Sequence, residues 1–288
     1  MQPAIFSKVF DDRPLEDAVI TAAEIGFDGI EIMAREPHFP ADTDQERADE
    51  IADIIGDYGL TVPCLATYTG GYARKSDAEC EAELEAFERF LALAEILDVE
   101  LLRHGAGRPS VRQATEADFE RAASWLRRAA NLAAEYDRTV GLEIHAHRLT
   151  ETVDATLRLL DAVDRDNVGV IHDAGNMFIV DDSYGPESLD RIGDQLAHVH
   201  VKDLSRVDES SMPDVFSLET PRGDEHFRRE LLGDGDVDHQ PLFAALGERG
   251  YDGFATAETN VGRFDRQTVA RRELEGLTRL SDGVDASR

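Results

Sequence analysis

Residues 196–203 (Leu-Ala-His-Val-His-Val-Lys-Asp) alternate apolar and ionisable side chains. This period of two predicts a strand in which His198, His200 and Lys202 share one face. Three polar or ionisable side chains on one face of an otherwise apolar strand are costly unless they meet a metal, a ligand or one another. We therefore interpret this face as part of a functional site, with the wet face of an edge strand as the alternative.

Ionisable residues also stand at the ends of other apolar runs, and these are His104, Glu143, His145, Asp173 and Glu258. Six of the nine histidines of the chain lie at such predicted strand ends. Histidines scattered over a surface would not gather in this way. The strand ends are therefore the places where the sequence predicts chemistry.

Four of these residues form what we name the ligand cluster: Glu143, Asp173, His200 and Glu258. They come from four consecutive predicted strands at equivalent depth. Three carboxylates around one axis repel one another strongly, and a divalent cation between them removes the repulsion. An oxygen-rich set with one nitrogen favours Mn²⁺ first, with Mg²⁺ or Co²⁺ as alternatives, over an ion that prefers thiolates. Each residue alone could be a hydrogen-bonded core group, but the four together predict one metal ion.

Short apolar runs alternate with amphipathic stretches along the whole chain. The runs centre on Ile5, Ile30, Val62, Leu101, Leu142, Val170, Val199 and Ala255. Residues 77–97 have helical apolar spacing, and Ser76 with Glu79 predicts a capping box before them. Eight such alternations without a linker predict an α/β fold, namely a single-domain (β/α)₈ TIM barrel over residues 1–280. In such barrels the active site lies at the carboxyl ends of the strands.

Three other features bear on the organisation of the chain. A doubly wound open sheet is the alternative fold, but the first predicted βα turn has no Gly-rich phosphate loop. The polar residues 204–233 interrupt the regular strand spacing and could form a lid or a variable surface loop. Residues 281–288 are expected to form a flexible tail.

The composition is strongly acidic, with 60 Asp and Glu against 30 Lys and Arg and a formal net charge of -30. Only three of the basic residues are lysines. Such a surface is typical of a protein from a salt-rich (halophilic) cytoplasm, where salt screens the self-repulsion. The charge argues against a nucleic-acid partner. Two cysteines and the lack of a long apolar run predict a soluble cytoplasmic protein without a membrane partner.

Residues 4–280 resemble the xylose isomerase-like TIM-barrel superfamily of sugar isomerases, epimerases and related dehydratases. The shared motifs are Gly-Phe-Asp-Gly-Ile-Glu (26–31), Leu-Glu-Ile-His (142–145), Asp-Ala-Gly-Asn (173–176), His-Val-His-Val-Lys-Asp (198–203) and Gly-Asp-Gly-Asp-Val-Asp (233–238). The resemblance implies that the ligand cluster binds the metal. It also implies that Glu143 and Glu258 flank the substrate and carry protons.

This chemistry leads to three hypotheses. A metal that chelates a carbonyl and a neighbouring hydroxyl acidifies the adjacent C–H. The first hypothesis is therefore a sugar isomerase or epimerase that works through a metal-stabilised enediolate. A dehydratase of a cyclic polyol or keto acid, similar to inosose or dehydroshikimate dehydratases, is the second. A non-catalytic, metal-containing sugar-binding barrel is the third. Ketose epimerases of the superfamily often carry His and Glu where this chain has Asn176 and Leu149, which weakens the epimerase hypothesis.

The expected partner is a small sugar or polyol substrate, and a homodimer or homotetramer is possible for barrels of this kind. The candidate substrate-binding residues are His104, His145, Asn176, His198, Lys202, Arg206 and Tyr68. Lys202 and Arg206 could instead be paired with an acid such as Asp203.

Overall fold

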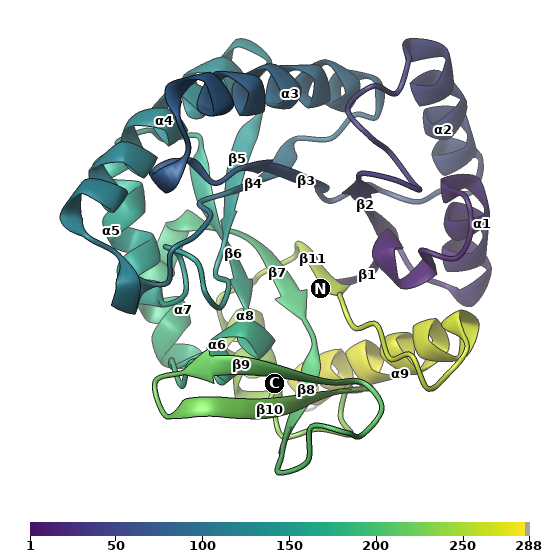
Figure 1. Cartoon of the computed structure of the whole chain (residues 1–288). Helices are drawn as coiled ribbons and strands as arrows, with labels where there is room; N and C mark the ends of the chain where they lie inside the picture. Colours follow the sequence, from purple (N-terminus) through teal and green to yellow (C-terminus); the bar gives the residue numbers. More distant parts are fainter. Residues whose placement is uncertain (286–288) are drawn as a thin grey trace.

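In the computed structural model, which describes residues 1–285, eight parallel strands close into a barrel inside a ring of helices (Figure 1). Around the barrel the order is β1-β11-β7-β6-β5-β4-β3-β2. The strands are β1 (Gln2–Phe6), β2 (Gly29–Ala34), β3 (Leu65–Gly70), β4 (Leu101–Gly105), β5 (Thr139–Glu143), β6 (Val168–Asp173), β7 (Leu196–Val201) and β11 (Phe254–Ala257). The predicted single-domain TIM barrel is confirmed.

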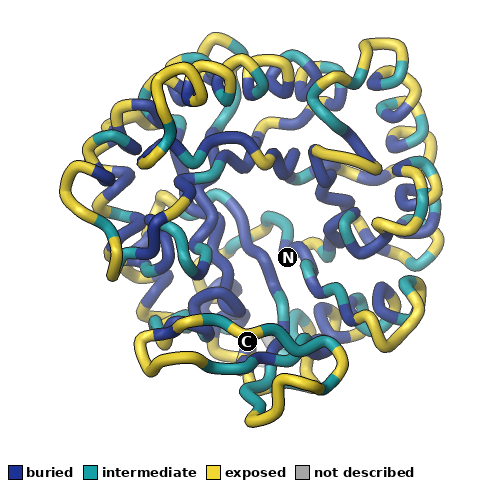
Figure 2. Tube along the Cα trace, in the orientation of Figure 1, coloured by how far each residue is buried: buried dark blue, intermediate teal, exposed yellow. Residues whose placement is uncertain are grey.

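The α-helices connect successive strands and cover the outside of the barrel. They are α1 (Leu15–Ile25), α2 (Gln45–Asp57), α3 (Asp77–Ile96), α4 (Glu116–Glu135), α5 (Val153–Val163), α6 (Ala174–Ile179), α7 (Pro186–Ile192), α8 (Gln240–Glu248) and α9 (Arg266–Asp285). The 3₁₀ turns are η1 (Ser7–Phe10), η2 (Tyr72–Arg74), η3 (Val111–Gln113) and η4 (Gly193–Gln195). The predicted capping box of Ser76 and Glu79 begins α3. Figure 2 shows the barrel strands mostly buried and the outer helix faces exposed.

Two predicted boundaries were wrong. The third strand was expected around Val62 but begins at Leu65, because Pro63 has no N–H to donate to the strand ladder. The tail was expected to begin at residue 281, whereas α9 continues to Asp285. Residues 286–288 lie outside the described part of the chain.

The segment between the seventh and eighth barrel strands has its own regular structure. It forms a three-stranded antiparallel sheet of β8 (Asp203–Val207), β9 (Val215–Thr220) and β10 (Gly223–Glu230) in the order β8-β10-β9. Phe227 of β10 stacks on Phe216 and meets Phe178 of α6 edge to face, so the sheet packs against the barrel beside β7 (Figure 1). We name this unit the insert sheet.

One buried carboxylate fixes the return of the chain from the insert sheet. Asp203 accepts hydrogen bonds from four backbone amides, those of Leu204, Gly233, Gly235 and Val237, at 2.8–3.1 Å. A Cβ atom at position 235 would lie only 2.2 Å from Asp203 Oδ1. The Gly-Asp-Gly-Asp-Val-Asp motif therefore wraps around Asp203, and the close approach requires glycine.

A second buried carboxyl lies behind this loop. Glu273 of α9 accepts a hydrogen bond from the Leu232 backbone amide through Oε1, at 3.1 Å. Burial, and then the nearby charge of Asp203, raise the pKa of Glu273 to about 8.

No helix in the described part of the chain combines the length and apolar character needed to cross a membrane.

We expect Gly235→Ala to lower the free energy of unfolding by about 1–3 kcal/mol, because the new methyl group collides with the Asp203 carboxylate. Urea denaturation measures the change. Gly56→Ala in α2 is the matched control, since a Cβ there meets nothing within 4 Å and should leave stability equal or slightly higher. Equal stability of the two variants would contradict the packing assigned to Asp203.

Glu273→Gln should reduce the loss of stability that occurs as pH rises from about 4.5 to about 8. The folded-state pKa is raised from 4.5 to about 8, so the carboxyl group supports folding below its unfolded pKa and this support disappears as pH rises toward 8. Urea denaturation at about pH 5 and about pH 9 should show a decline a few kcal/mol smaller in the variant than in the wild-type protein. Parallel declines would contradict a neutral buried Glu273.

Candidate active site

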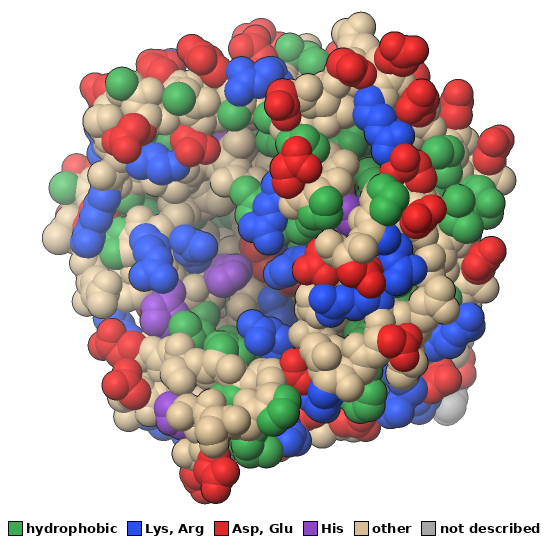
Figure 3. All heavy atoms as spheres, turned by 45° about the vertical axis from the view of Figure 1, so that its right-hand side comes forward, with side chains coloured by type: hydrophobic (Ala, Val, Ile, Leu, Met, Phe, Trp, Pro, Cys, Tyr) green, Lys and Arg blue, Asp and Glu red, His purple; other side chains and the backbone are tan. Residues whose placement is uncertain are grey.

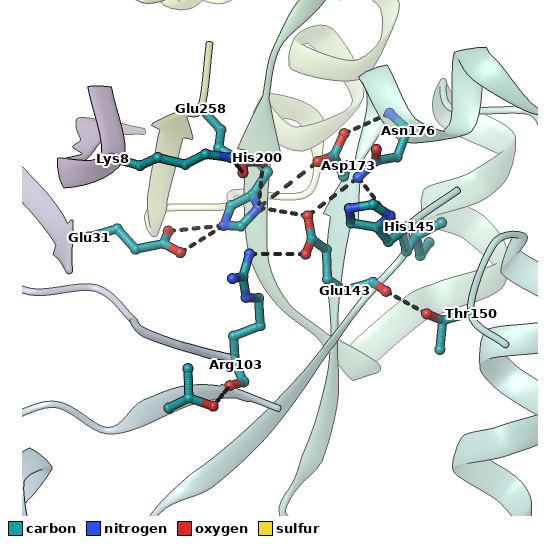
Figure 4. A network of polar contacts seen from close by, with 12 residues as sticks. Lys8, Glu31, Arg103, Glu143, His145, Thr150, Asp173, Asn176, His200 and Glu258 are labelled. Carbon is teal, nitrogen blue, oxygen red and sulfur yellow. Dashed lines mark hydrogen bonds and ion pairs between the residues drawn. The ribbon is translucent and has the colours of Figure 1, made fainter. Parts of the chain in front are cut away.

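The four residues of the ligand cluster converge at the carboxyl end of the barrel (Figure 4). Asp173 and His200 are register partners on β6 and β7, and Glu143 and Glu258 come from the ends of β5 and β11. One potential ligand atom from each lies within 4.8 Å of the others. His200 Nδ1 faces the carboxylates, at 3.4 Å from Glu143, 3.8 Å from Glu258 and 4.0 Å from Asp173.

The orientation of the His200 ring is fixed from behind by Glu31. His200 Nε2 lies 2.9 Å and 3.1 Å from the two oxygens of this fully buried carboxylate on β2, to which it donates. His198 Nε2 lies 3.2 Å from the same carboxylate. Burial lowers the pKa of His200, but Glu31 and Glu143 outweigh it, so the pKa stands well above its ordinary value. A carboxylate behind a ligating histidine is the arrangement that fixes ring orientation in metal sites.

Glu143 is held by the side chains of Arg103, Asn176 and His200. Arg103 on β4 donates to Glu143 Oε2 at 3.1 Å, and the Asn176 amide lies 3.3 Å from Oε1. Burial alone would raise the pKa of Glu143, but Arg103 and then His200 bring it well below its usual range. The Glu143 carboxylate is therefore ionised and oriented toward the centre of the cluster.

Lys202 lies between the other two carboxylates. Its Nζ is 2.7 Å from both Asp173 Oδ2 and Glu258 Oε2. Gly175 makes room for this side chain, because a Cβ there would lie 2.2 Å from Lys202 Cγ. Burial raises the pKa of Glu258, but Lys202 and then Lys8 outweigh it and bring the value to about 2.

Asp173 is the least satisfied member of the cluster. Among the described residues no group makes a hydrogen bond of normal geometry to its buried Oδ2, although the Lys202 ammonium lies 2.7 Å away. Burial, together with the charges of Glu143 and Glu258, raises the pKa of Asp173 to about 7. An unsatisfied oxygen among converging carboxylates and an oriented imidazole fits a divalent cation, whose charge would replace the protons held here.

The ligand cluster opens into a cavity of about 450 Å³, the mouth cavity, lined by Tyr68, Arg103, His145 and Glu258 among others. A further space of about 240 Å³, the insert lobe, continues toward the insert sheet. Both spaces are lined by Lys8, Arg108, His145, Arg148 and Glu258. In Figure 3, Lys, Arg and His side chains gather around the central hollow, while Asp and Glu are more frequent toward the rim. A cavity of this size suits a single sugar or polyol ring.

The structure places the predicted substrate-binding residues in different settings. Tyr68 (42% exposed), His145, Asn176 and Lys202 line the mouth cavity or the insert lobe. His145 Nδ1 bonds to the Ala146 carbonyl at 2.8 Å, which leaves Nε2 without a protein partner among the described residues.

The other three predicted residues are occupied by protein groups. Both ring nitrogens of His104 have partners, Thr69 Oγ1 at 2.9 Å and Tyr72 Oη at 2.8 Å. His198 is buried against Glu31. Arg206 lies on β8, where it pairs with Asp181 at 2.7 Å. These side chains support the site from behind or from the side.

Sequence reasoning missed Glu31 and Arg103 as site residues. Glu31 is the last residue of the Gly-Phe-Asp-Gly-Ile-Glu motif, which was used above only as evidence for the family resemblance. Arg103 directly precedes His104, which was predicted. A charged residue within an apolar barrel strand was the available signal, because such a residue is buried only when paired.

A profile described as the xylose isomerase-like TIM barrel matches residues 19–280. The chain belongs to this family. Inosose dehydratase of Geobacillus kaustophilus is 29% identical over 181 residues, covering 59% of this chain and 56% of that protein. The 3-dehydroshikimate dehydratase of Bacillus anthracis is 25% identical over 269 residues, covering 91% and 93%.

The fold comparison agrees with this family. The crystal structure of the probable 3-DHS dehydratase AsbF from Bacillus anthracis has a TM-score of 0.80 at 22% identity, covering 96% of this chain and 99% of that one. The chain spans only about half the length of the inosose dehydratases it matches, but nearly all of the 3-dehydroshikimate dehydratase. Within the xylose isomerase-like family, these relatives support the dehydratase hypothesis better than the isomerase or epimerase hypothesis, which is not confirmed.

We expect Glu31→Gln to weaken Mn²⁺ binding by about 10–100-fold, because the neutral amide no longer fixes the His200 ring or its charge. Isothermal titration calorimetry with Mn²⁺ measures this. The control is Glu24→Gln, an exposed position on α1, which should bind Mn²⁺ like the wild-type protein. Equal affinity of both variants would show that Glu31 does not support a metal ligand.

Proposed function

We propose that the protein is a divalent-metal-dependent dehydratase of a cyclic keto acid or keto polyol. The convergence of the ligand cluster beside the mouth cavity carries the metal-dependent part of this proposal. The similarity to 3-dehydroshikimate dehydratase over nearly the whole chain favours loss of water as the reaction.

The metal would be held by the ligand cluster. Three carboxylates and one imidazole suit Mn²⁺, with Mg²⁺ or Co²⁺ as alternatives. When bound, such an ion polarises a ketone and acidifies the neighbouring C–H. Glu31, Arg103 and Lys202 fix the positions of the surrounding side chains before substrate arrives.

We assign the proton transfers to Glu258. Its ionised carboxylate lines both parts of the cavity and is held by Lys202 at 2.7 Å. Glu258 removes the proton from the carbon beside the ketone and returns it to the hydroxyl on the next carbon. The C–H and C–O bonds break, a C=C bond forms, and water leaves.

The remaining groups position the substrate. Glu143, fixed by Arg103, flanks the ring on the other side. His145 presents Nε2, which has no partner among residues 1–285, to a substrate hydroxyl, and Tyr68 offers an aromatic face. Asn176 and Lys202 complete the wall toward the insert lobe.

Isomerisation or epimerisation is the second candidate, because return of the proton to carbon on the same site would give it. The position of Leu149 counts against it, since this side chain is fully buried and apolar where ketose epimerases of the family often carry Glu. Halophilic origin, cytoplasmic location and assembly into dimers or tetramers stay predictions.

The test combines Mn²⁺-loaded protein with 3-dehydroshikimate and, separately, an inosose in D₂O. We expect loss of water, followed by mass spectrometry, and a decrease of about 100-fold or more for Glu258→Gln. Glu24→Gln is again the control. Deuterium uptake without water loss would favour the epimerase candidate, and binding without either would favour a non-catalytic barrel.

A further inference from the structure

Three arginines that line the insert lobe have no acidic partner in the described part of the chain. Arg108 follows β4, Arg148 follows β5, and Arg229 lies on β10 of the insert sheet. Among the described residues, none of their guanidinium groups makes a hydrogen bond or an ion pair. Arg229 only covers the Phe216 ring, at 4.6 Å.

Carboxylates that could pair with these arginines are abundant in the chain. The chain has twice as many carboxylates as basic groups, and most of its arginines that have partners pair with Asp or Glu. Arg148 is half-buried, and burial and then the charge of Arg108 lower its pKa. Like charges held together at a cavity wall cost free energy unless an anion joins them.

The surroundings of the arginines suit a bound ligand. His147 also lines the insert lobe, in a left-handed backbone conformation (φ 63°), and its buried Nε2 has no hydrogen-bond partner in the described structure. Strained residues and unsatisfied polar atoms are concentrated at functional sites. Lys202 and Glu258 line the same lobe, so it is continuous with the ligand cluster.

We propose that the substrate carries an oxyanion, a carboxylate or a phosphate, which binds between Arg108, Arg148 and Arg229 while its keto end lies at the ligand cluster. Guanidinium groups bind both anions through paired N–H donors. The insert sheet thereby supplies part of the substrate site. This inference rests on the proposed function and narrows its substrate class to anionic compounds.

The test measures binding by isothermal titration calorimetry to the Mn²⁺-loaded protein and to Arg148→Gln and Arg229→Gln. The probes are 3-dehydroshikimate, its neutral methyl ester, a ketose phosphate and inorganic phosphate. We expect each substitution to weaken binding of at least one anion by about 10-fold or more, with less than about twofold change for the ester. Carboxylate-only and phosphate-only effects both support the site and identify the anion.

Arg271→Gln is the matched control, because Arg271 is exposed on α9, has no partner among the described residues and lies outside the cavity. Its anion binding should equal that of the wild-type protein. Thermal unfolding without ligand adds a second readout, in which Arg148→Gln should be as stable as the wild-type protein or more stable, because repulsion with Arg108 is relieved.

Wild-type affinity for every anion in both cavity variants, or an equal loss for the ester, would overturn the oxyanion site. Dehydration of a neutral inosose by the wild-type protein as fast as that of any anionic probe would also overturn it, yet leave the dehydratase intact. Selective anion binding without dehydration would instead sustain the oxyanion site and refute the proposed function.

Discussion

Charge buried at the carboxyl end of the barrel is the constraint on which the site depends. Three carboxylates of the ligand cluster face His200 Nδ1, and the four side chains are almost completely buried. Their repulsion is offset by cationic groups from neighbouring strands, above all Arg103 and Lys202. Glu31 then balances the imidazole from behind. The eight-stranded closure is what brings these charges, far apart in sequence, to one point.

Much of this arrangement could be predicted from the sequence. Parallel strands of a barrel end at the same rim, so residues at strand ends such as Glu143 and His200 had to be neighbours. The role of Glu31 could not be predicted in this way, because one acidic residue at the end of a motif does not reveal which histidine it orients. Val62 misled the strand assignment for a local reason, the proline that follows it.

The segment between β7 and β11 was harder to predict. Its polar sequence was compatible with a lid or a surface loop, and the alternation of apolar residues was too short to identify three strands. Its order comes from contacts with the rest of the chain. Phe227 packs on Phe178, and Arg112 of η3 donates to the Thr220 carbonyl. Such long-range contacts are not visible in local patterns.

The four backbone hydrogen bonds to Asp203 have an evolutionary consequence. One carboxylate, that of Asp203, holds both the beginning of the insert sheet and the loop that follows it. The two ends of the inserted segment are therefore fixed to each other independently of the residues between them. Lineages could therefore exchange or lengthen the insert sheet while the end of the barrel that carries the ligand cluster stayed intact. The residues at the end of the barrel would then stay the same, and a different inserted segment would change which molecules reach them.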